Sequence, residues 1–311
     1  MRQTFLRLCG VFLILAGHVC AQDLSPRAYV ITPVHANAAL LTWSYFNGGL
    51  NVNGASAIPI TGAMGVYNVQ IISLYHSFDF FGRSANVAVG LPYAIGTFSA
   101  MGPKREVSVY RSGMVDLTTR FSVNLLGGPA MQPREFAKWR QKVLLGASLR
   151  MIAPTGQYSS KELVTWGINR WAFKPELGYS ERWGNWLLDA YAGAWFYTTN
   201  PASFAFPKPL SQTENPIGSF EGHISRNFGA GTWVSFDGNF WWGGVTTLGG
   251  RQRPDTRQTS SRLGGTAAWR YSHHQSIKVS YSDGAYVRFG GNYQNVSVAW
   301  QYSWLGWHFT K

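Results

Sequence analysis

The chain has 311 residues, of which 15% are aromatic and only 13% charged, and 27 Lys and Arg stand against 14 Asp and Glu. Soluble domains average about 25% charged residues, so this composition, with 14 Trp and 35 Gly, is atypical of a soluble domain. The basic residues are scattered, with no run longer than Lys104-Arg105, and we expect no nucleic-acid partner. The excess charge indicates attraction to anionic lipid head groups or acidic solutes, or merely a basic surface.

The first 21 residues, 1–21, predict a secretory signal peptide. Arg2 and Arg7 give a positive start, and about ten apolar residues follow (LCGVFLILAG), with small side chains leading to a cleavage site after Ala21. This apolar stretch is shorter than the ~20 residues that a membrane-spanning helix needs. We therefore expect export, and a mature chain over residues 22–311.

Both cysteines, Cys9 and Cys20, lie within the signal peptide, so the mature chain has none. This excludes disulfides and thiolate chemistry, and stability must come from a large core or a closed hydrogen-bonded architecture. The adjacent His273 and His274 lie in a short turn where their side chains point apart, which disfavours metal binding. We expect no cofactor and no metal site.

In the mature chain, segments of about 9–14 residues alternate apolar and polar side chains between clusters of Gly, Pro, Asn and Ser. From 115 to 125, for example, Leu117, Phe121 and Val123 alternate with Arg120 and Asn124. The pattern predicts strands over 38–46, 66–80, 86–98, 114–126, 142–153, 173–182, 186–198, 217–227, 232–243, 262–271, 276–285 and 293–304.

Few charges, many aromatic residues and no long apolar run favour a membrane protein that crosses lipid with strands, whose backbone groups must all be paired. We expect an all-β fold: a transmembrane, antiparallel, up-and-down β-barrel of about 12 strands after the signal peptide, with both chain ends on the periplasmic side. A soluble β-sandwich or jelly roll also alternates, but it should carry more surface charge.

The connections tend to alternate between short turns and long polar segments, as in outer-membrane barrels. The long ones are predicted over 102–113, 155–172, 200–216 and 245–261. The segment 127–141 is an exception, long where a short turn is expected, and residues 134–140 (REFAKWR) predict a short helix there. Tryptophans near strand ends predict two interfacial girdles: Trp166, Trp171, Trp183, Trp186, Trp241, Trp304 and Trp307.

Several segments resemble the family of the MetA pathway of phenol degradation. They are SGMVDLTTRFSVNLLGGPA (112–130), LGASLRMIAPTGQY (145–158), NRWAFKPELGYSERWGNWLLDAYAGAWFYT (169–198), SFEGHISRNF (219–228), VSFDGNFWWGG (234–244) and SYSDGAYVRFGGNYQNVSVAWQYSW (280–304). The resemblance extends from about Arg27 to Trp304. It implies a bacterial outer-membrane barrel, often labelled a transporter, that passes small hydrophobic or aromatic molecules. It supplies no binding residues.

The alternation directs a set of polar side chains into the lumen, where they are candidates for lining a pore. They are Asp116, Arg120, Asn124, Arg150, Asp189, Glu221, His223, Asp237, Asn239, Arg270, Lys278 and Gln301. Paired charges of both signs could narrow and polarise a channel. Alternatively they could fill the interior with salt bridges and make a structural or adhesin-like barrel.

A barrel lipid hydrolase is the weaker alternative. Glu221, His223 and Ser225 share one strand face, with the residue types of an orienter, a base and a nucleophile. Neighbours at i and i+2 are ~6.5–7 Å apart along a strand, too far for a direct Ser–His hydrogen bond. We therefore expect no enzymatic activity.

The expected location is the bacterial outer membrane. The expected partners are membrane lipid, a small-molecule solute and the barrel-assembly machinery during insertion. The sequence leaves open the oligomeric state, the identity of the solute, and whether residues 22–37 plug the barrel.

Overall fold

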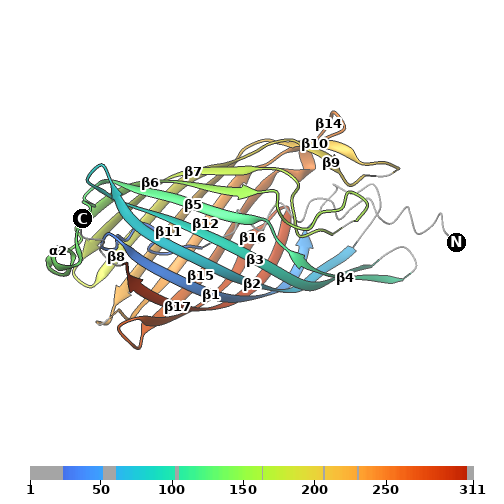
Figure 1. The fold of residues 1–311 in the computed structure, drawn as a ribbon. Coiled ribbons are helices and arrows are strands. Elements are labelled where there is room, and N and C mark those ends of the chain that lie inside the picture. Colours follow the sequence, from blue (N-terminus) through green and yellow to red (C-terminus); the bar gives the residue numbers. More distant parts are fainter. Residues whose placement is uncertain are drawn as a thin grey trace.

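A computed structural model describes residues 24–51, 61–101, 105–162, 164–205, 207–229 and 231–306, so the expected signal peptide lies outside the described residues. Within these ranges one antiparallel sheet closes on itself, because β2 pairs with both β1 and β3 (Figure 1). Its strands are β1 (Ala36–Asn51), β2 (Thr61–Phe80), β3 (Arg83–Met101), β4 (Glu106–Met114), β5 (Leu117–Leu126), β6 (Val143–Ala153), β7 (Ala172–Trp183), β8 (Trp186–Tyr197), β11 (Ile217–Asn227), β12 (Trp233–Gly243), β15 (Gln258–Arg270), β16 (Gln275–Val287) and β17 (Gly290–Leu305).

The sheet is a twelve-strand barrel in the described part of the chain, because β4 and β5 are two parts of one barrel strand. Both pair with β3, one after the other along its length. The interruption falls opposite Pro92, which has no N–H to give to a ladder. The carbonyl of Pro92 still accepts a hydrogen bond from Val115 N at 2.9 Å. The predicted all-β, twelve-strand antiparallel barrel is confirmed.

Two expectations about the connections were wrong. Residues 102–113 were expected to be a polar loop, but β4 begins at Glu106, because alternating Val107 and Val109 continue the strand pattern. The connections at 200–216 and 245–261 also contain strands, which form a separate small sheet of β9 (Asn200–Ser203), β10 (Leu210–Glu214), β13 (Thr246–Leu248) and β14 (Arg251–Arg253). A 3-10 helix, η3 (Pro254–Thr256), follows β14.

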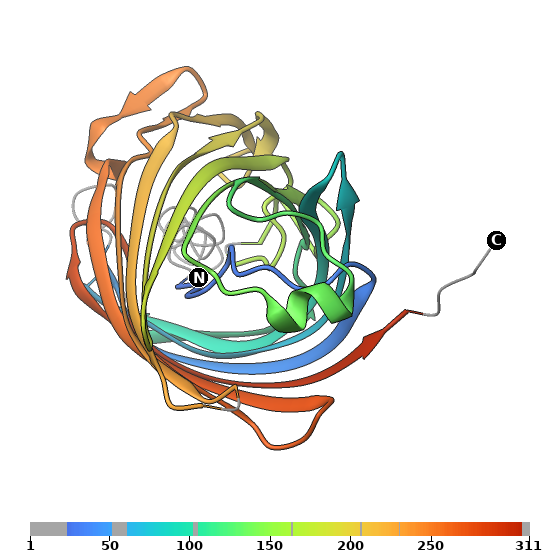
Figure 2. The same ribbon diagram turned by 90° about the vertical axis from the view of Figure 1, so that its left-hand side faces the viewer.

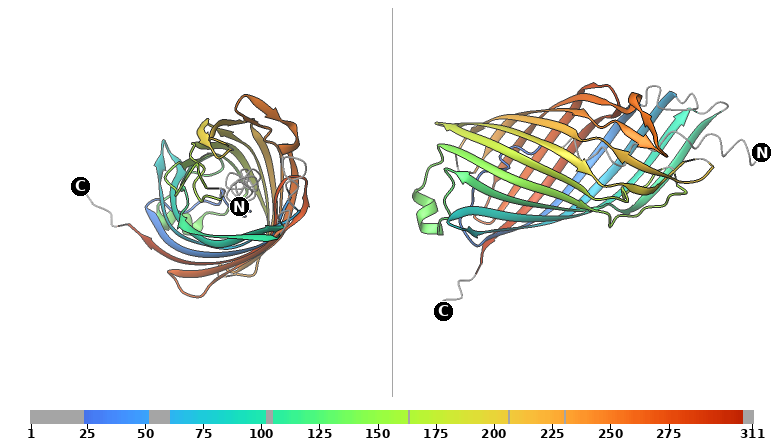
Figure 3. Two further views of the ribbon diagram at one scale, coloured as in Figure 1. Left: turned by 90° about the vertical axis from the view of Figure 1, so that its right-hand side faces the viewer. Right: turned by 90° about the horizontal axis from the view of Figure 1, so that it is seen from above.

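The two ends of the barrel differ, as Figure 3 shows from one end and from above. One end, here the short-turn end, holds the start of β1, the end of β17 and turns such as Phe81-Gly82. The predicted helix is confirmed there as α2 (Pro133–Lys138). The other end, the long-loop end, carries the small sheet and the connection between β6 and β7.

The outer surface is apolar and the interior polar, as the alternation predicts. Phe236 is 59% exposed, whereas its neighbour Asp237 is fully buried. Leu74 and Leu263 are likewise exposed on the outer face. Such a face suits lipid rather than water. Within the described ranges, no helix has the length and apolarity needed to span a bilayer.

The predicted tryptophan girdles are partly wrong. Trp171, Trp183, Trp186 and Trp304 are 39–53% exposed at strand ends, but Trp166 and Trp241 lie inside. Trp241 is at an inward-facing position of β12, and its Nε1 donates a hydrogen bond to Gln258 Oε1 at 2.8 Å. Trp166 packs against Phe98 because its connection folds into the barrel. Trp307 lies outside the described residues.

Candidate functional site: the barrel interior

Residues 24–35, which precede β1, lie inside the ring of strands (Figure 2). We call residues 24–35 the N-terminal segment. It turns at Arg27, whose φ of 63° is in the left-handed region that non-glycine residues rarely adopt. The backbone N–H of Val30 closes this turn on the Arg27 carbonyl at 3.2 Å. A strained residue persists where its surroundings hold it in place, and here both the Arg27 side chain and its neighbours are bound to the barrel wall.

Arg27 binds the wall formed by β8, β11 and β12. Its Nε and one Nη donate to Ser225 Oγ at 3.0 and 2.9 Å, and the other Nη donates to Asn227 Oδ1 at 2.9 Å. The guanidinium lies 4.2 Å above the ring of Trp233. Burial lowers the pKa of Arg27 to about 10, against the attraction of Asp189, so the side chain stays charged at neutral pH.

Tyr29 fits a gap in the wall between β6 and β7. Gly146 and Gly178 are directly opposite each other, and a Cβ on either would overlap the Tyr29 ring. The hydroxyl of Tyr29 lies 3.0 Å from Ser148 Oγ and donates to Glu176 Oε1 at 3.1 Å. The two glycines are therefore required by the close approach of the ring, and they fix where the N-terminal segment docks.

The long connection at the short-turn end packs on the same segment. Ile31 forms an apolar cluster with Met131 and Leu144, and Phe136 and Trp139 of the α2 region pack against that cluster. This contact explains the long connection where a short turn was expected. The connection covers the N-terminal segment at the end where it enters the barrel.

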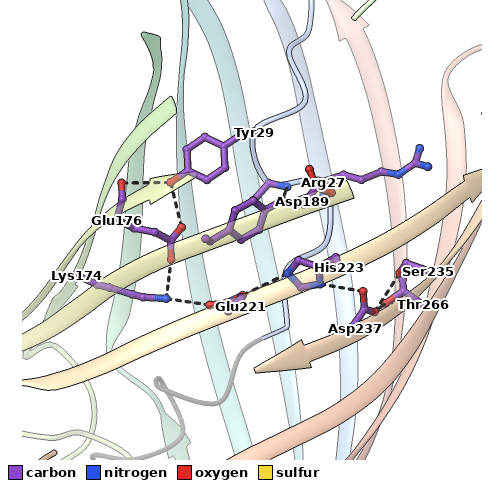
Figure 4. A network of polar contacts seen from close by, with 12 residues as sticks. Arg27, Tyr29, Lys174, Glu176, Asp189, Glu221, His223, Ser235, Asp237 and Thr266 are labelled. Carbon is purple, nitrogen blue, oxygen red and sulfur yellow. Dashed lines mark hydrogen bonds and ion pairs between the residues drawn. The ribbon is translucent and has the colours of Figure 1, made fainter. Parts of the chain in front are cut away.

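A chain of buried charges runs along the wall beside the N-terminal segment (Figure 4). Lys174 Nζ lies 2.6 Å from Glu176 Oε2 and 2.9 Å from Glu221 Oε1, and all three side chains are at most 10% exposed. Glu176 Oε1 also lies 3.8 Å from Arg120 Nη2. Opposite charges at these separations neutralise one another inside the barrel, where an unpaired charge would be strongly disfavoured.

The chain of charges continues from Glu221 to Asp237 through His223. His223 Nδ1 lies 2.9 Å from Asp237 Oδ1, and Ser235 and Thr266 donate to Asp237 Oδ2 at 3.0 and 2.8 Å. Ser225, the nucleophile of the hydrolase alternative, accepts its hydrogen bonds from Arg27. In the described part of the chain it makes none with His223.

At the long-loop end, the connection between β6 and β7 folds inward. Asp116 holds it by accepting hydrogen bonds from the backbone N–H groups of Gly156 and Ile168, each at 2.7 Å. Val164 and the ring of Trp166 then pack on aromatic side chains of the wall. This infolded loop, residues 155–162 and 164–171, therefore occupies the mouth of the barrel at the end opposite the N-terminal segment.

A cavity of about 510 Å³ lies within the barrel, lined by side chains from both of these segments and from the strands. Aromatic rings gather on one side of it, with Tyr67 stacked on Phe46 at 4.6 Å between ring centroids. The remaining lining mixes hydroxyl groups such as Ser297 with charged side chains such as Arg120 and Lys278. A volume of this size accommodates a small organic molecule.

The structure distributes the predicted pore candidates over three environments. Asp116, Arg120, Arg150, Asp237 and Lys278 line the cavity; Asp189, Glu221, His223, Asn239 and Asn124 are buried without lining it; Gln301 and Arg270 neither line it nor are buried. Asn124 is buried with Nδ2 3.5 Å from Ser84 O, and Gln301 donates to Ser303 Oγ. Arg270 is exposed at the end of β15. Whether any of them lines a conducting pore stays a prediction.

Sequence reasoning missed Lys174, Glu176, Arg27 and Tyr29. Lys174 and Glu176 lie inside the predicted strand 173–182, and inward parity there would have included both. Arg27 and Tyr29 precede the first strand, where the alternation gives no information. No sequence signal places that segment inside the barrel.

Residues 64–307 match the family of the MetA pathway of phenol degradation. The chain belongs to this family. The resemblance of the individual segments to this family is thereby confirmed. Among curated proteins, none matches the chain.

Two solved structures show the same kind of fold. An outer membrane channel from Pseudomonas putida F1 is 18% identical, with 91% of this chain and 100% of that chain covered and a TM-score of 0.73. The β domain of the Bordetella autotransporter BrkA is 13% identical, with coverage of 86% and 100% and a TM-score of 0.52. The fold is thus that of outer-membrane barrels.

Proposed function

We propose that this protein is a channel of the bacterial outer membrane that passes small hydrophobic or aromatic solutes. The observation that carries the proposal is the cavity inside the barrel, with aromatic rings such as Tyr67 and Phe98 on one side and hydroxyl groups elsewhere in its lining. The family to which the chain belongs and the likeness of its fold to an outer membrane channel support the same function. Membrane lipid, the solute and the barrel-assembly machinery are the partners that this role requires.

In this proposal the N-terminal segment and the infolded loop are the two gates. Neither is part of the sheet ladder of the barrel; each is held by side-chain contacts, such as Arg27 on Ser225 for the segment and Asp116 on Ile168 for the loop. Local units outside the strand ladder open more readily than strands of a closed barrel. Displacement of both connects the cavity to the two sides of the membrane.

The test is conductance and solute flux of the purified, refolded protein. In planar bilayers we expect ion-current steps that increase when residues 22–35 are deleted. Proteoliposomes should take up small aromatic solutes faster than empty liposomes. Heat-modifiable migration on a gel shows first that the barrel is folded. A folded barrel that gives no ion current and no uptake of aromatic solute, both with and without residues 22–35, favours the structural or adhesin-like alternative.

The hydrolase alternative has its own test. Ser225→Ala removes one hydrogen-bond acceptor of Arg27. If the protein is a channel, the wild type and this variant should show the same background rate of lipid hydrolysis. A hydrolase activity that is present in the wild type and lost in this variant would contradict the proposal.

A further inference from the structure

Three cations lie side by side on the inner wall. Arg120 on β5 is directly opposite Arg150 on β6, and Arg150 is directly opposite Lys174 on β7. Like charges directly opposite on neighbouring strands are destabilising. The twelve-strand sheet does not need such a row in order to close. Considered without their carboxylate partners, the three cations disfavour strand pairing, and such a local arrangement is typical of a functional position.

Two carboxylates contact members of this row. Lys174 contacts Glu176 and Glu221, and Glu176 is 3.8 Å from Arg120. Two cations of the row, Arg120 and Arg150, line the cavity, whereas Glu176 and Glu221 do not.

The facing wall is also positive. Lys278 on β16 and Arg262 on β15 line the cavity, and Lys278 has no ion pair within the described part of the chain. Of the described residues that line the cavity, Asp116 and Asp237 are acidic. Asp116 already accepts two backbone hydrogen bonds, and Asp237 contacts three neighbouring side chains. Among the described residues that line the cavity, basic side chains therefore outnumber acidic ones, and both acidic side chains already accept hydrogen bonds.

A buried donor points to the same ligand chemistry. Trp195 lines the cavity and is fully buried, and its Nε1 has no hydrogen-bond partner among the described residues. A buried N–H without an acceptor is unfavourable, and an oxygen atom of a bound solute would satisfy it. On the aromatic side of the cavity, the ring centroids of Tyr67 and Tyr293 lie 5.9 Å from each other. These rings offer a surface on which an apolar ring can pack.

We propose that the cavity selects small organic anions that carry an aromatic or other apolar ring, with aromatic carboxylates as the simplest case. This inference rests on the proposed channel function and adds the sign of the solute's charge. Arg120, Arg150 and Lys278 attract the anionic group, and the aromatic side of the cavity packs against the ring. Clefts lined by one sign of charge concentrate ions of the opposite sign.

The experiment compares benzoate with benzyl alcohol, which share the ring and differ in charge. Binding to the refolded full-length mature protein is measured by calorimetry. Ion selectivity is measured as the reversal potential across a planar bilayer under a KCl gradient. We expect benzoate to bind at least about tenfold more tightly than benzyl alcohol, and the reversal potential to show a preference for Cl⁻ over K⁺.

Substitutions locate the effect. Arg150→Gln and Lys278→Gln should each weaken benzoate binding by about tenfold and leave benzyl alcohol unchanged. Arg150→Lys keeps the charge and should retain anion selectivity, which separates charge from packing. Arg251→Gln, on the exposed β13–β14 hairpin, makes the same change in net charge and should have no effect.

The outcomes separate the two proposals. A conducting barrel that prefers K⁺ or binds both probes equally overturns the anion inference and leaves the channel function intact. Unchanged benzoate binding in both Gln variants overturns it as well. A folded barrel that neither conducts nor binds either probe overturns both proposals.

Discussion

The ring of Tyr29 fills the space in which any side chain at position 178 would lie, and Gly178 leaves that space free. Gly146, directly opposite on β6, leaves the adjoining space free in the same way. The N-terminal segment therefore docks where two neighbouring strands have glycine at directly opposite positions. The conformation of that segment decides whether the barrel is obstructed at its short-turn end.

Gly178→Ala should displace Tyr29, because the added methyl group overlaps the ring. Overpacking of this kind costs about 1–3 kcal/mol, and here the docked segment is the part able to move. We expect a higher single-channel conductance with an unchanged barrel. Gly222→Ala on β11 is the matched control, because its new Cβ would have room. Equal conductance in both variants would contradict the docking role of Gly178.

Arg27→Ala should also loosen the segment. It removes the charged hydrogen bonds to Ser225 and Asn227, and bonds to charged groups contribute about 1.5–3 kcal/mol each when well formed. We expect faster hydrogen exchange of residues 24–35 and more frequent channel openings. The control is Arg226→Ala on β11, whose side chain lies near Trp186 and Phe228 on the outer face. A segment as protected as in the wild type would count against Arg27 as its anchor.

Lys174→Met should strongly destabilise the barrel. It leaves Glu176 and Glu221 without their nearest cation in a buried position, and loss of one partner of a buried pair costs about 3–5 kcal/mol. The measurement is urea unfolding in lipid vesicles, followed by heat-modifiable migration. Replacing both glutamates by Gln in the same variant should recover part of the loss. No recovery would mean that Lys174 acts through packing rather than charge.

Asp116→Ala should release the infolded loop. The substitution leaves the N–H groups of Gly156 and Ile168 without their acceptor, at a cost of about 1–3 kcal/mol for each buried group. Trypsin should then cleave faster after Lys161, which is exposed in that loop. Asp255→Ala in the exposed η3 turn is the control. Unchanged cleavage would show that other contacts hold the loop in place.

The alternation of side chains was sufficient to predict the barrel, because the two faces of a strand meet lipid and lumen along its whole length. Phe236 and Asp237 illustrate this, since neighbouring positions on β12 have opposite environments. The same rule placed Glu221 and His223 inside. The predicted boundary was wrong at Glu106, where a segment rich in polar residues continues as a strand and Val107 and Val109 still alternate with polar residues.

What the sequence by itself determined is therefore the fold class, the strand count and the inward parity of the alternating strands, all of which depend on local periodicity. It also indicated the family, through the resemblance of individual segments. Only the tertiary structure decided that Arg27 and Tyr29 fill one end of the lumen and that Trp166 folds into the other. It also brought Arg120, Arg150 and Lys278 to one cavity. These contacts join residues distant in sequence, and their geometry depends on barrel closure and strand register, which alternation alone does not specify.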